Sequence, residues 1–403
     1  MEGQRSAQIV NVLLVAPYLG GSHQAWASGY ARHSRHEVSL LALPARFWKW
    51  RMQGGPVTLA TMLRERISAG QSRPDVVLAT DMANLPAFLG LARDLLGDVP
   101  VALYCHENQL TYPLPEGEAR DLTYPMVNWL SMLVADRVYF NTQYHLMDWF
   151  EALPGLLRLF PDYRHLPLVD RVYAKSAVLP VGCELRGLEA AASSAGEPAA
   201  EGAGGREPPQ GSGIILWNQR WEYDKDPATF VRALDALVAR GVPFRVALAG
   251  TNVWQQTSVF EAARERLGER VIHFGRADRS TYRRLLWDAA VVASTALHEF
   301  FGVAVVEAIA CGTFPVLPAR LSYPELLPEP HHGRCLYRDF EDLVAKLAWA
   351  LENGAAARAL ADALRPAMMQ YDWAALAPQY DAALAELADI ADARSWRRGA
   401  VTG

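Results

Sequence analysis

Short apolar runs and amphipathic stretches alternate along both halves of this 403-residue chain. The apolar runs have strand length, and the stretches between them space their apolar residues as one face of a helix does. Repeated alternation of this kind predicts parallel sheets that are covered by helices on both faces. The predicted strands are residues 9–17, 38–43, 76–80, 101–105, 137–141 and 177–181, then 213–217, 245–249, 271–274, 290–294 and 313–317. The clearest predicted helices are residues 227–240, 258–267, 280–289 and 340–352.

The chain is too long for a single hydrophobic core, so two domains are expected. Residues 187–213 are rich in Ala, Gly, Ser, Glu and Pro and predict a flexible linker. We therefore expect an α/β protein with two Rossmann-like, doubly wound domains, residues 1–186 and 214–365. Residues 366–403 should form helices that return to the first domain. Ligands of such sheets bind outside the carboxyl ends of the strands, so the active site is expected in a cleft between the domains.

Composition narrows the class of protein. Hydrophobic residues make up 51% and charged residues 21% of the chain, as in globular proteins, and no apolar run is long enough for a membrane helix. The first apolar run is interrupted by Asn11 and predicts a strand rather than a signal peptide. Scattered cysteines without metal-like spacing indicate reduced thiols, and hence a cytoplasmic protein. The net charge of −5 gives no overall basic field, and the first 186 residues carry 17 charges of each sign.

The most informative segment is HEFFGVAVVE, which follows the predicted strand 290–294. It places Glu299 in a loop and Glu307 on a helix that begins near Gly302. A glycine there lets a ligand approach the backbone, and the free amides of Phe301, Gly302 and Val303 at a helix start favour an anion. The competing interpretation is a pair of solvated glutamates on an ordinary amphipathic helix.

A second motif, WNQRWEYDKDP, follows the first strand of the second half. It carries Arg220 and Lys225 just before a helix for which Pro227 is a favourable first residue. A departing diphosphate needs positive charge where its negative charge develops, and an Arg–Lys pair supplies it. Alone, the motif is equally compatible with surface charge in a loop.

Together these two motifs resemble the large family of retaining glycosyltransferases of GT-B fold that includes sucrose and glycogen synthases. The resemblance implies that Arg220 and Lys225 hold the donor diphosphate. It also implies that Glu307 binds the donor ribose and that Glu299 contacts the transferred sugar. The nucleotide base would be held by the backbone after the predicted strand 271–274, at Gly275 and Arg276.

Motifs of the first half narrow the resemblance. A strand-to-helix turn holds Gly20, Gly21, Ser22 and His23, where a ligand can approach the backbone. With the segments RFWKWR, YCHENQLTYP, FPDYR, SYPE and DWAAL, the chain resembles the tRNA-queuosine α-mannosyltransferase family from about Leu13 to about Leu376. This resemblance implies GDP-mannose as the donor and queuosine at the wobble position of tRNA as the acceptor. It implies retention of configuration, and we expect neither a metal nor an obligate protein partner.

The resemblance also assigns candidate residues on the first domain. His106 stands at a strand end, where retaining GT-B enzymes commonly keep a histidine near the transferred sugar; the alternative is a histidine that caps the following turn. Glu107, Asn108 and Gln109 are candidate acceptor contacts that the sequence does not rank. Cations interleaved with aromatic rings suit single-stranded RNA, although an amphipathic segment with its tryptophans in the core gives the same pattern. The candidate tRNA-binding residues are Arg46, Trp48, Lys49, Arg51 and Arg164.

Two alternatives stay open at this point. One is a GT-B glycosyltransferase with another donor or with a lipid or polysaccharide acceptor. The other, of a different class, is a catalytically inactive tRNA-binding module. Substitution of Arg220, Lys225 or Glu307 would leave the function of such a module intact.

Overall fold

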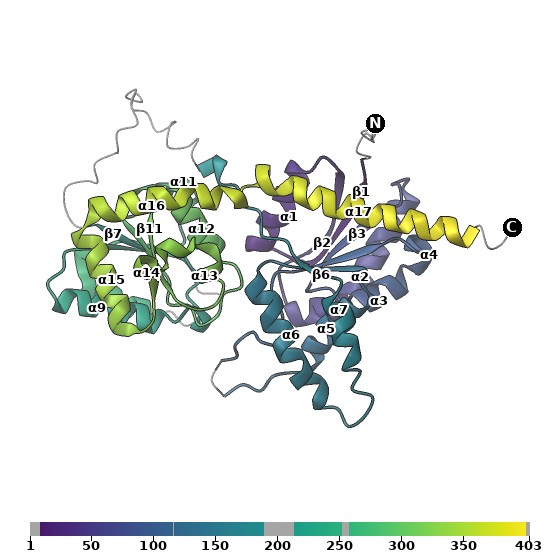
Figure 1. Ribbon diagram of the computed structural model, residues 1–403, viewed down its shortest axis with the longest axis horizontal. Coiled ribbons are helices and arrows are strands. Elements are labelled where there is room, and N and C mark those ends of the chain that lie inside the picture. Colours follow the sequence, from purple (N-terminus) through teal and green to yellow (C-terminus); the bar gives the residue numbers. More distant parts are fainter. Residues whose placement is uncertain (1–8, 116, 189–212, 252–257, 400–403) are drawn as a thin grey trace. The chain divides into compact units, whose positions relative to one another are not determined.

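The computed structural model describes residues 9–115, 117–188, 213–251 and 258–399. Nearly all of the predicted linker lies outside these ranges. The chain divides into two compact units (Figure 1). Unit 1 comprises Met1–Cys183 and Trp373–Gly403, and unit 2 comprises Glu184–Asp372. Residues 366–372, expected in the returning segment, lie in unit 2, because the helix Gly354–Met368 continues there and Tyr371 packs on Phe301.

Unit 1 is built on a six-stranded parallel sheet in the order β2-β1-β3-β4-β5-β6. On one face α1 and the long last helix α17 pack together, and α17 also contacts β3 and β4. On the other face α2, α3 and α5 pack against one another (Figure 1). The strands are β1 (Asn11–Leu19), β2 (Glu37–Pro44), β3 (Val76–Thr80), β4 (Val101–Cys105), β5 (Arg137–Phe140) and β6 (Ser176–Val178). The helices are α1 (Gly21–His33), α2 (Trp48–Ser68), α3 (Leu85–Leu91), α4 (Arg93–Leu96), α5 (Thr123–Val134), α6 (Gln143–Arg158), α7 (Pro167–Tyr173) and α17 (Trp373–Gly399).

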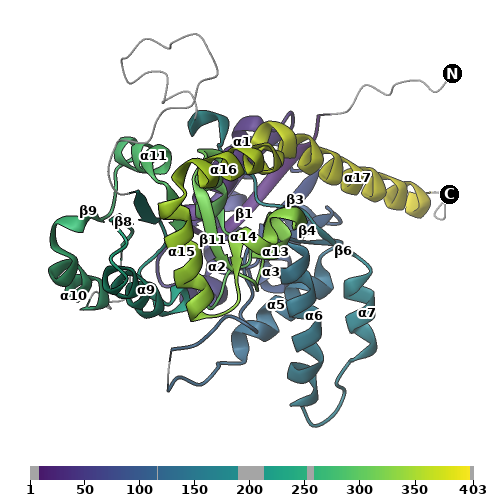
Figure 2. The same ribbon diagram turned by 60° about the vertical axis from the view of Figure 1, so that its left-hand side comes forward.

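Unit 2 repeats the design with a parallel sheet in the order β12-β11-β10-β7-β8-β9. Helices α9, α10 and α15 cover one face, and α11, α12 and α16 cover the other (Figure 2). The strands are β7 (Ile214–Trp217), β8 (Arg245–Ala249), β9 (Val271–Gly275), β10 (Val291–Ala293), β11 (Phe314–Pro318) and β12 (Leu336–Tyr337). The helices are α9 (Pro227–Ala239), α10 (Ser258–Leu267), α11 (Arg279–Asp288), α12 (Val303–Ala310), α13 (Tyr323–Leu326), α14 (His332–Cys335), α15 (Phe340–Glu352) and α16 (Gly354–Met368).

All eleven predicted strands form, three of them with the predicted ends and the others with ends that move by at most three residues, and the α/β prediction is confirmed. The sequence pattern missed β12, because a two-residue strand is too short to produce one. In each sheet the strand order reverses beside the first strand, between β1 and β3 in unit 1 and between β7 and β10 in unit 2. Such a reversal opens a crevice at the carboxyl ends of the strands, and this is where open α/β sheets bind ligands.

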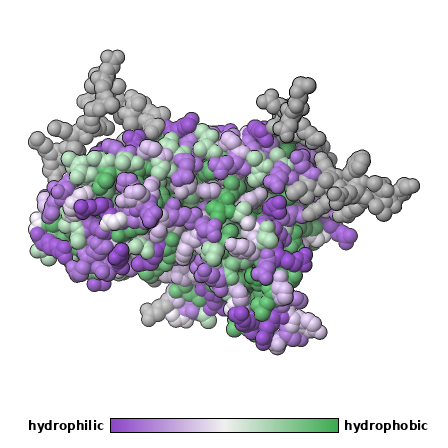
Figure 3. All heavy atoms as spheres, in the orientation of Figure 1, coloured by the Kyte–Doolittle hydropathy of each residue, from purple (hydrophilic) through white to green (hydrophobic). Residues whose placement is uncertain are grey.

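The sheets are buried, and the surface carries both hydrophilic and hydrophobic residues. All five residues of β3 and of β4 are buried, as expected for central parallel strands. On the face shown in Figure 3, hydrophilic and hydrophobic residues are interspersed over both units. Within the described residues, no helix combines the length and the hydropathy that a membrane crossing requires.

The last helix is fastened to unit 1 by aromatic packing. Trp373, the first residue of α17, is only 1% exposed, and its backbone N–H donates to the carbonyl of Cys183 at 3.0 Å. Its indole lies against Gly29 of α1 and Gly182, where an added Cβ would overlap the ring. Further along α17, the hydroxyl of Tyr380 accepts a hydrogen bond from Trp26 Nε1 at 3.0 Å. The two glycines are therefore needed for the close approach of α17.

We predict that Gly29→Ala lowers the stability of unit 1, although alanine is the better helix former. The methyl group would collide with the buried Trp373 ring, and overpacking of this kind costs about 1–3 kcal/mol. Gly155→Ala in α6 is the matched control, since nothing lies within 4 Å of its added Cβ. Thermal unfolding should show a lower melting temperature for Gly29→Ala and an equal or higher one for Gly155→Ala. Equal melting temperatures for both variants would contradict the packing described for α17.

Candidate active site

A buried cation marks the crevice of unit 2. The Lys225 side chain is 8% exposed and lies 3.1 Å from Asp224 Oδ2 and 3.2 Å from Glu299 Oε2. Its ammonium group also donates to the carbonyl of His298 at 2.7 Å. Burial alone would lower the pKa of Lys225, but the carboxylates of Glu299 and Asp224 outweigh it and raise the pKa. Lys225 is therefore a permanent positive charge at the carboxyl edge of the sheet.

Backbone contacts lock the loop of Lys225 to the loop of Glu299. The carbonyl of Asp224 accepts from the amides of Leu297 and His298 at 2.8 and 3.2 Å. The Thr295 hydroxyl donates to the carbonyl of Lys225 at 2.9 Å. The loops follow β7 and β10, the two strands at which the sheet order reverses. Residues that are more than seventy positions apart in the sequence thus form one rigid cluster.

Arg220 is the exposed cation of this cluster. One side of its guanidinium pairs with Glu222 Oε2 at 2.7 Å and with Asp224 Oδ2 at 3.4 Å. The side chain is 49% exposed, whereas Asp224 is fully buried. Asp224 thus lies between the two cations and orients both, and Arg220 can still meet an anion from solvent.

Next to this cluster, helix α12 begins at an unusual backbone position. Gly302, its N-cap, has a φ of 100°, a backbone conformation that residues other than glycine rarely adopt. No side chain caps the helix start from Gly302, whereas the N–H of Phe301 donates to Glu299 Oε1 at 3.4 Å. The amides that begin at Val303 therefore point toward the same loop as Lys225. A helix start of this kind favours a negatively charged group.

Glu307 lies one turn further along α12 and belongs to a second polar cluster. Its Oε2 accepts a hydrogen bond from the Tyr282 hydroxyl at 2.6 Å. Asn218, directly after β7, donates to that hydroxyl at 3.3 Å and to the carbonyl of Ala304 at 2.8 Å. Burial raises the pKa of Glu307, and the bond from Tyr282 partly offsets this. A carboxylate so oriented is suited to accept hydrogen bonds from neutral hydroxyl groups.

The residues expected to hold a base follow β9. Gly275 has a φ of 107°, and its carbonyl accepts from the amide of Gly250 at 3.1 Å. Arg276, the next residue, is exposed. Both residues lie at the carboxyl end of the outermost strand of the sheet, where the backbone turns toward α11.

In unit 1 the glycine turn lies at the corresponding crevice. Gly20 is the N-cap of α1, and a Cβ there would come within 2.5 Å of Ala45 Cβ. Gly21 has a φ of 55° and open space around it, and Ser22 is exposed on the first turn of α1. The turn is therefore open to a ligand on one side and closed by the β2–α2 loop on the other.

A stack of two histidines lies beside this turn. The rings of His23 and His106 are 4.3 Å apart and nearly parallel, and the Trp26 ring meets His106 edge-on. The His106 side chain is 8% exposed, and burial lowers its pKa to about 3, so the imidazole is neutral. Asp81 follows β3 and is 1% exposed; its Oδ1 lies 3.5 Å from His106 Nδ1 and accepts from the His106 backbone N–H at 2.9 Å. Burial raises the pKa of Asp81 to about 6, although His23 opposes the shift.

The residues after His106 form a tight loop. Asn108 is fully buried, and its Oδ1 accepts from the amides of Leu110 and Thr111 at 3.0 and 2.9 Å. Gln109 Nε2 donates to Glu107 Oε1 at 3.1 Å, and both side chains are half-buried. Asn108 therefore stabilises this loop from inside the protein. Of the three candidate acceptor contacts, only Glu107 and Gln109 have side chains that are partly exposed to solvent.

The predicted RNA-binding residues separate into two places. Arg46, Trp48, Lys49 and Arg51 cluster at the start of α2, which follows β2 at the carboxyl edge of the sheet. Arg164 is exposed in the loop between α6 and α7. The 16 residues of α6 separate that loop from the carboxyl edge by roughly 24 Å. The structure thus brings the α2 residues close to the glycine turn, and it leaves Arg164 apart from them.

Several polar residues of these clusters were not predicted from the sequence. Asp81 follows a strand directly, and Asp224 and Glu222 lie inside the Arg–Lys motif, so strand ends were the signal that could have identified them. Tyr282 lies inside a helix far from either motif, and no sequence signal indicated its bond to Glu307. Within the described chain, no group of three or more His, Cys, Asp or Glu residues could hold a metal ion.

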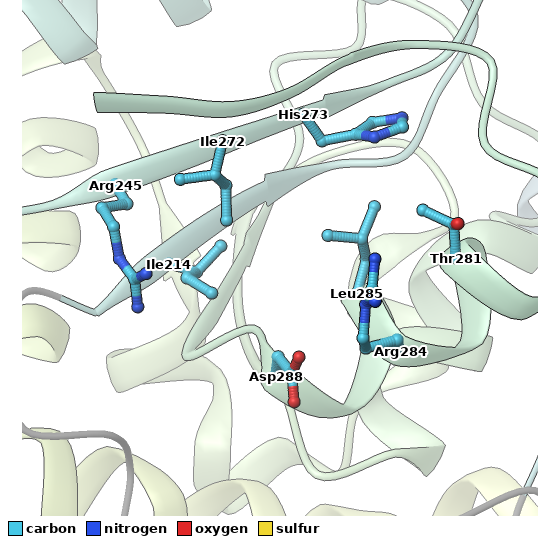
Figure 4. Close-up of a pocket in the computed structure, with 8 residues that line it drawn as sticks. All are labelled: Ile214, Arg245, Ile272, His273, Thr281, Arg284, Leu285 and Asp288. Carbon is cyan, nitrogen blue, oxygen red and sulfur yellow. The ribbon is translucent and has the colours of Figure 1, made fainter. Parts of the chain in front are cut away.

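A hollow of about 270 Å³ also lies in unit 2, on another side of the sheet (Figure 4). Ile214 and Arg245, the first residues of β7 and β8, line one side, and Arg284 and Asp288 of α11 line the other. It therefore opens at the amino ends of these strands and contains none of the predicted site residues. The candidate site residues of each unit lie in the polar clusters at the carboxyl edge of its own sheet, and not in this hollow.

Comparison with known proteins decides the family. Residues 11–183 match the family model described as tRNA-queuosine alpha-mannosyltransferase N-terminal, and residues 205–365 match glycosyl transferases group 1. The tRNA-queuosine alpha-mannosyltransferase of Drosophila melanogaster is 31% identical over 340 residues, which are 84% of this chain and 86% of that protein. The chain belongs to the tRNA-queuosine alpha-mannosyltransferase family. As a member of that family with a group 1 domain, it is a glycosyltransferase, as the motifs predicted.

Solved structures agree with this family assignment at the level of the fold. The sucrose-phosphate synthase of Thermosynechococcus elongatus superimposes with a TM-score of 0.62 at 18% identity, over 98% of this chain and all of that one. The Anabaena protein HepE, solved with UDP-glucose, gives a TM-score of 0.64 at 16% identity, over 94% of this chain and all of that one. This tRNA-queuosine alpha-mannosyltransferase family member therefore has the GT-B fold, which confirms the predicted fold class.

The buried carboxyl of Asp81 predicts a pH-dependent stability. Because folding raises its pKa from 3.8 to about 6, the stabilisation by its protonated form is complete below about pH 4 and is lost as the pH rises through 6. The melting temperature of Asp81→Asn minus that of the wild type should therefore increase between pH 4 and pH 7. Histidines that do not interact with Asp81 contribute equally to both proteins and cancel in this difference.

The control for this comparison is Asp94→Asn. Asp94 is exposed, and its hydrogen bond from Arg64 lowers its pKa, so it stays ionised over the same pH range. The melting temperature of Asp94→Asn minus that of the wild type should stay constant between pH 4 and pH 7. An equally flat curve for Asp81→Asn would show that the Asp81 carboxyl is not held protonated in the folded protein.

Proposed function

We propose that this glycosyltransferase moves mannose from GDP-mannose to queuosine at the wobble position of tRNA, with retention of configuration. Membership of the tRNA-queuosine alpha-mannosyltransferase family is the observation that carries the proposal. The polar clusters at the carboxyl edges of the two sheets support it, because each supplies groups that one substrate would need. Such an acceptor would be met in the cytoplasm, and no obligate protein partner is proposed.

Lys225, Arg220 and the start of α12 would hold the donor diphosphate. Lys225 keeps its charge in spite of burial, since Glu299 and Asp224 raise its pKa. Arg220 is half-exposed, and its guanidinium would contact a phosphate oxygen from the solvent side. The amides of Phe301, Gly302 and Val303 would add dipoles aimed at the same charge. Fixed positive charge at the departing group stabilises the transition state, and for that reason we propose that no metal is required.

The rest of the donor would lie along the same edge of unit 2. Glu307 gives one oxygen to Tyr282, and the other would accept hydrogen bonds from the ribose hydroxyls. The backbone of Gly275 and Arg276 would hold the base at the end of β9. Glu299 Oε2 lies 3.2 Å from Lys225 Nζ, and Oε1 accepts from the Phe301 N–H at 3.4 Å. The carboxylate held in this way would accept a further hydrogen bond from a hydroxyl of the transferred sugar.

On unit 1, the neutral His106 imidazole would position the reacting sugar or the acceptor. A neutral ring can both donate and accept a hydrogen bond, and burial excludes its protonation near neutral pH. His23 stacks on it and Asp81 approaches its Nδ1, so the ring is fixed in orientation. The backbone at Gly20 and Gly21 would admit the donor, while Ser22, Glu107 and Gln109 would contact the acceptor.

The proposed chemistry is a displacement on the face from which GDP leaves. The bond between the anomeric carbon and the β-phosphate oxygen breaks, and its electron pair stays with GDP. The acceptor hydroxyl oxygen bonds to the same carbon on the same face, and its proton passes to the departing phosphate oxygen. Configuration is therefore retained without a covalent enzyme intermediate, and Glu299 is assigned to sugar positioning.

The direct test is incubation of the purified protein with GDP-mannose and queuosine-containing tRNA. Nucleoside mass spectrometry should show a hexose mass gain on queuosine. Parallel reactions with UDP-glucose, and with tRNA that lacks queuosine, should give no product. Transfer from UDP-glucose alone would exclude GDP-mannose as the donor. No transfer from either donor would refute the proposed reaction.

We predict that Lys225→Met and Arg220→Ala each lower kcat by about 100-fold or more, because each removes charge stabilisation of the leaving diphosphate. The dissociation constant for tRNA should stay near the wild-type value, since these residues belong to unit 2 and the proposed RNA contacts to unit 1. Arg240→Ala is the control, because Arg240 makes only an exposed pair with Glu341. Full turnover in both site variants would show that Lys225 and Arg220 do not stabilise the leaving diphosphate.

A further inference from the structure

Two exposed aromatic side chains stand at the start of α2. Phe47 is 78% exposed and Trp50 is 63% exposed. Phe47 also has a φ of 52°, a left-handed conformation that is costly for a bulky residue. Exposure of two large rings, one of them on strained backbone, gives no packing energy to the fold. Such a combination points to a ligand that covers the rings.

The Trp50 ring has a prepared position on the helix surface. A Cβ added to Gly54, one turn further along α2, would come within 2.5 Å of the indole. The six-membered ring of Trp50 therefore lies over the glycine, and most of the side chain remains exposed to solvent. Gly54 weakens the helix by up to about 1 kcal/mol relative to alanine. Its position under the Trp50 ring explains why a glycine occupies this position.

Trp48, which the sequence placed among the RNA-binding residues, has a different environment. Its ring is partly buried and packs on Tyr124 at 4.8 Å, against the cluster around Met52. Lys49 Nζ lies 5.6 Å from the centre of the Trp48 ring. Trp48 therefore anchors the start of α2, and the free stacking faces belong to Phe47 and Trp50.

Charge and position favour a polyanion as the occupant of these faces. Arg46 and Lys49 are exposed beside the rings, and the sequence contains no acidic residue between Glu37 and Glu65. The segment also adjoins the proposed site, because the N–H of Ala45 donates to the carbonyl of Leu19 at 3.1 Å and Ala45 closes on Gly20. The rings thus lie within a few residues of the glycine turn at which the acceptor would react.

We infer that Phe47 and Trp50 are stacking platforms for unpaired bases of the tRNA anticodon loop, next to the base that is modified. This inference rests on the proposed function and specifies how its acceptor is held. Aromatic faces bind unpaired bases without requiring a particular sequence, and neighbouring cations bind the phosphates. The platforms hold the loop while the modified base enters the site beside Gly20 and His106.

The test compares Phe47→Ala, Trp50→Ala and Gly54→Ala in tRNA binding and in transfer to queuosine-containing tRNA. Loss of a stacked base costs 1–3 kcal/mol, so each ring variant should raise the dissociation constant and the KM for tRNA about 5-fold to 150-fold. The value of kcat at saturating tRNA should not change. Gly54→Ala should show the same defect at an unchanged or higher melting temperature, because it displaces the Trp50 ring and adds a better helix former.

Matched controls separate stacking from general loss of a surface residue. Tyr173→Ala removes another ring, 46% exposed, from helix α7, and Gly155→Ala changes a helical glycine with nothing near its Cβ. Both should bind tRNA as the wild type does. If the wild-type enzyme is active and both Trp50→Ala and Phe47→Ala bind tRNA with wild-type affinity, the two rings are not stacking platforms. If the wild type binds tRNA without transferring mannose, the proposed function is wrong. The tRNA affinities of the ring variants would still show whether Phe47 and Trp50 bind the RNA.

Discussion

Parallel strands direct all of their carboxyl ends to one edge of a sheet, and this constraint explains the position of every polar cluster described above. Asp81 and His106 directly follow the neighbouring strands β3 and β4, and Gly20 directly follows β1. The loops of Lys225 and Glu299 follow β7 and β10 in the same way. No long-range contact has to bring these residues together, since the sheet order alone makes them neighbours.

The two crevices differ in their electrostatics. In unit 2, carboxylates surround Lys225 and keep it charged in spite of burial. In unit 1, burial has the opposite outcome, because the His106 imidazole is neutral and the Asp81 carboxyl resists ionisation. One crevice thus presents fixed positive charge, which suits a diphosphate, and the other presents a neutral imidazole, which suits hydroxyls. A transferase that joins a charged donor to a neutral acceptor group needs both.

Much of the fold could be predicted from the sequence, because each buried parallel strand is a short run of apolar residues. The cations of unit 2 and the glycine of α12 were found for a similar reason, since they lie in the loops that follow strands. Tyr282 and Gly54 could not be found, because their roles depend on which residue lies across a helix surface or in another element. Trp48 and Trp50 differ by two positions and had the same sequence signal. Only the rotation of α2 decides that Trp48 faces Tyr124 and Trp50 faces solvent.

The attachment of α17 also has a consequence for biosynthesis. Trp26 and Tyr30 on α1 bind Tyr380 and Asp381, which leave the ribosome after all of unit 2. Until then the face of the first sheet beneath α17 has no cover, although its six strands are complete. The intermediate with unit 2 folded and this face bare exposes apolar surface and is the state in which aggregation is most expected. Chaperone dependence of the nascent chain should therefore persist until its last residues are made.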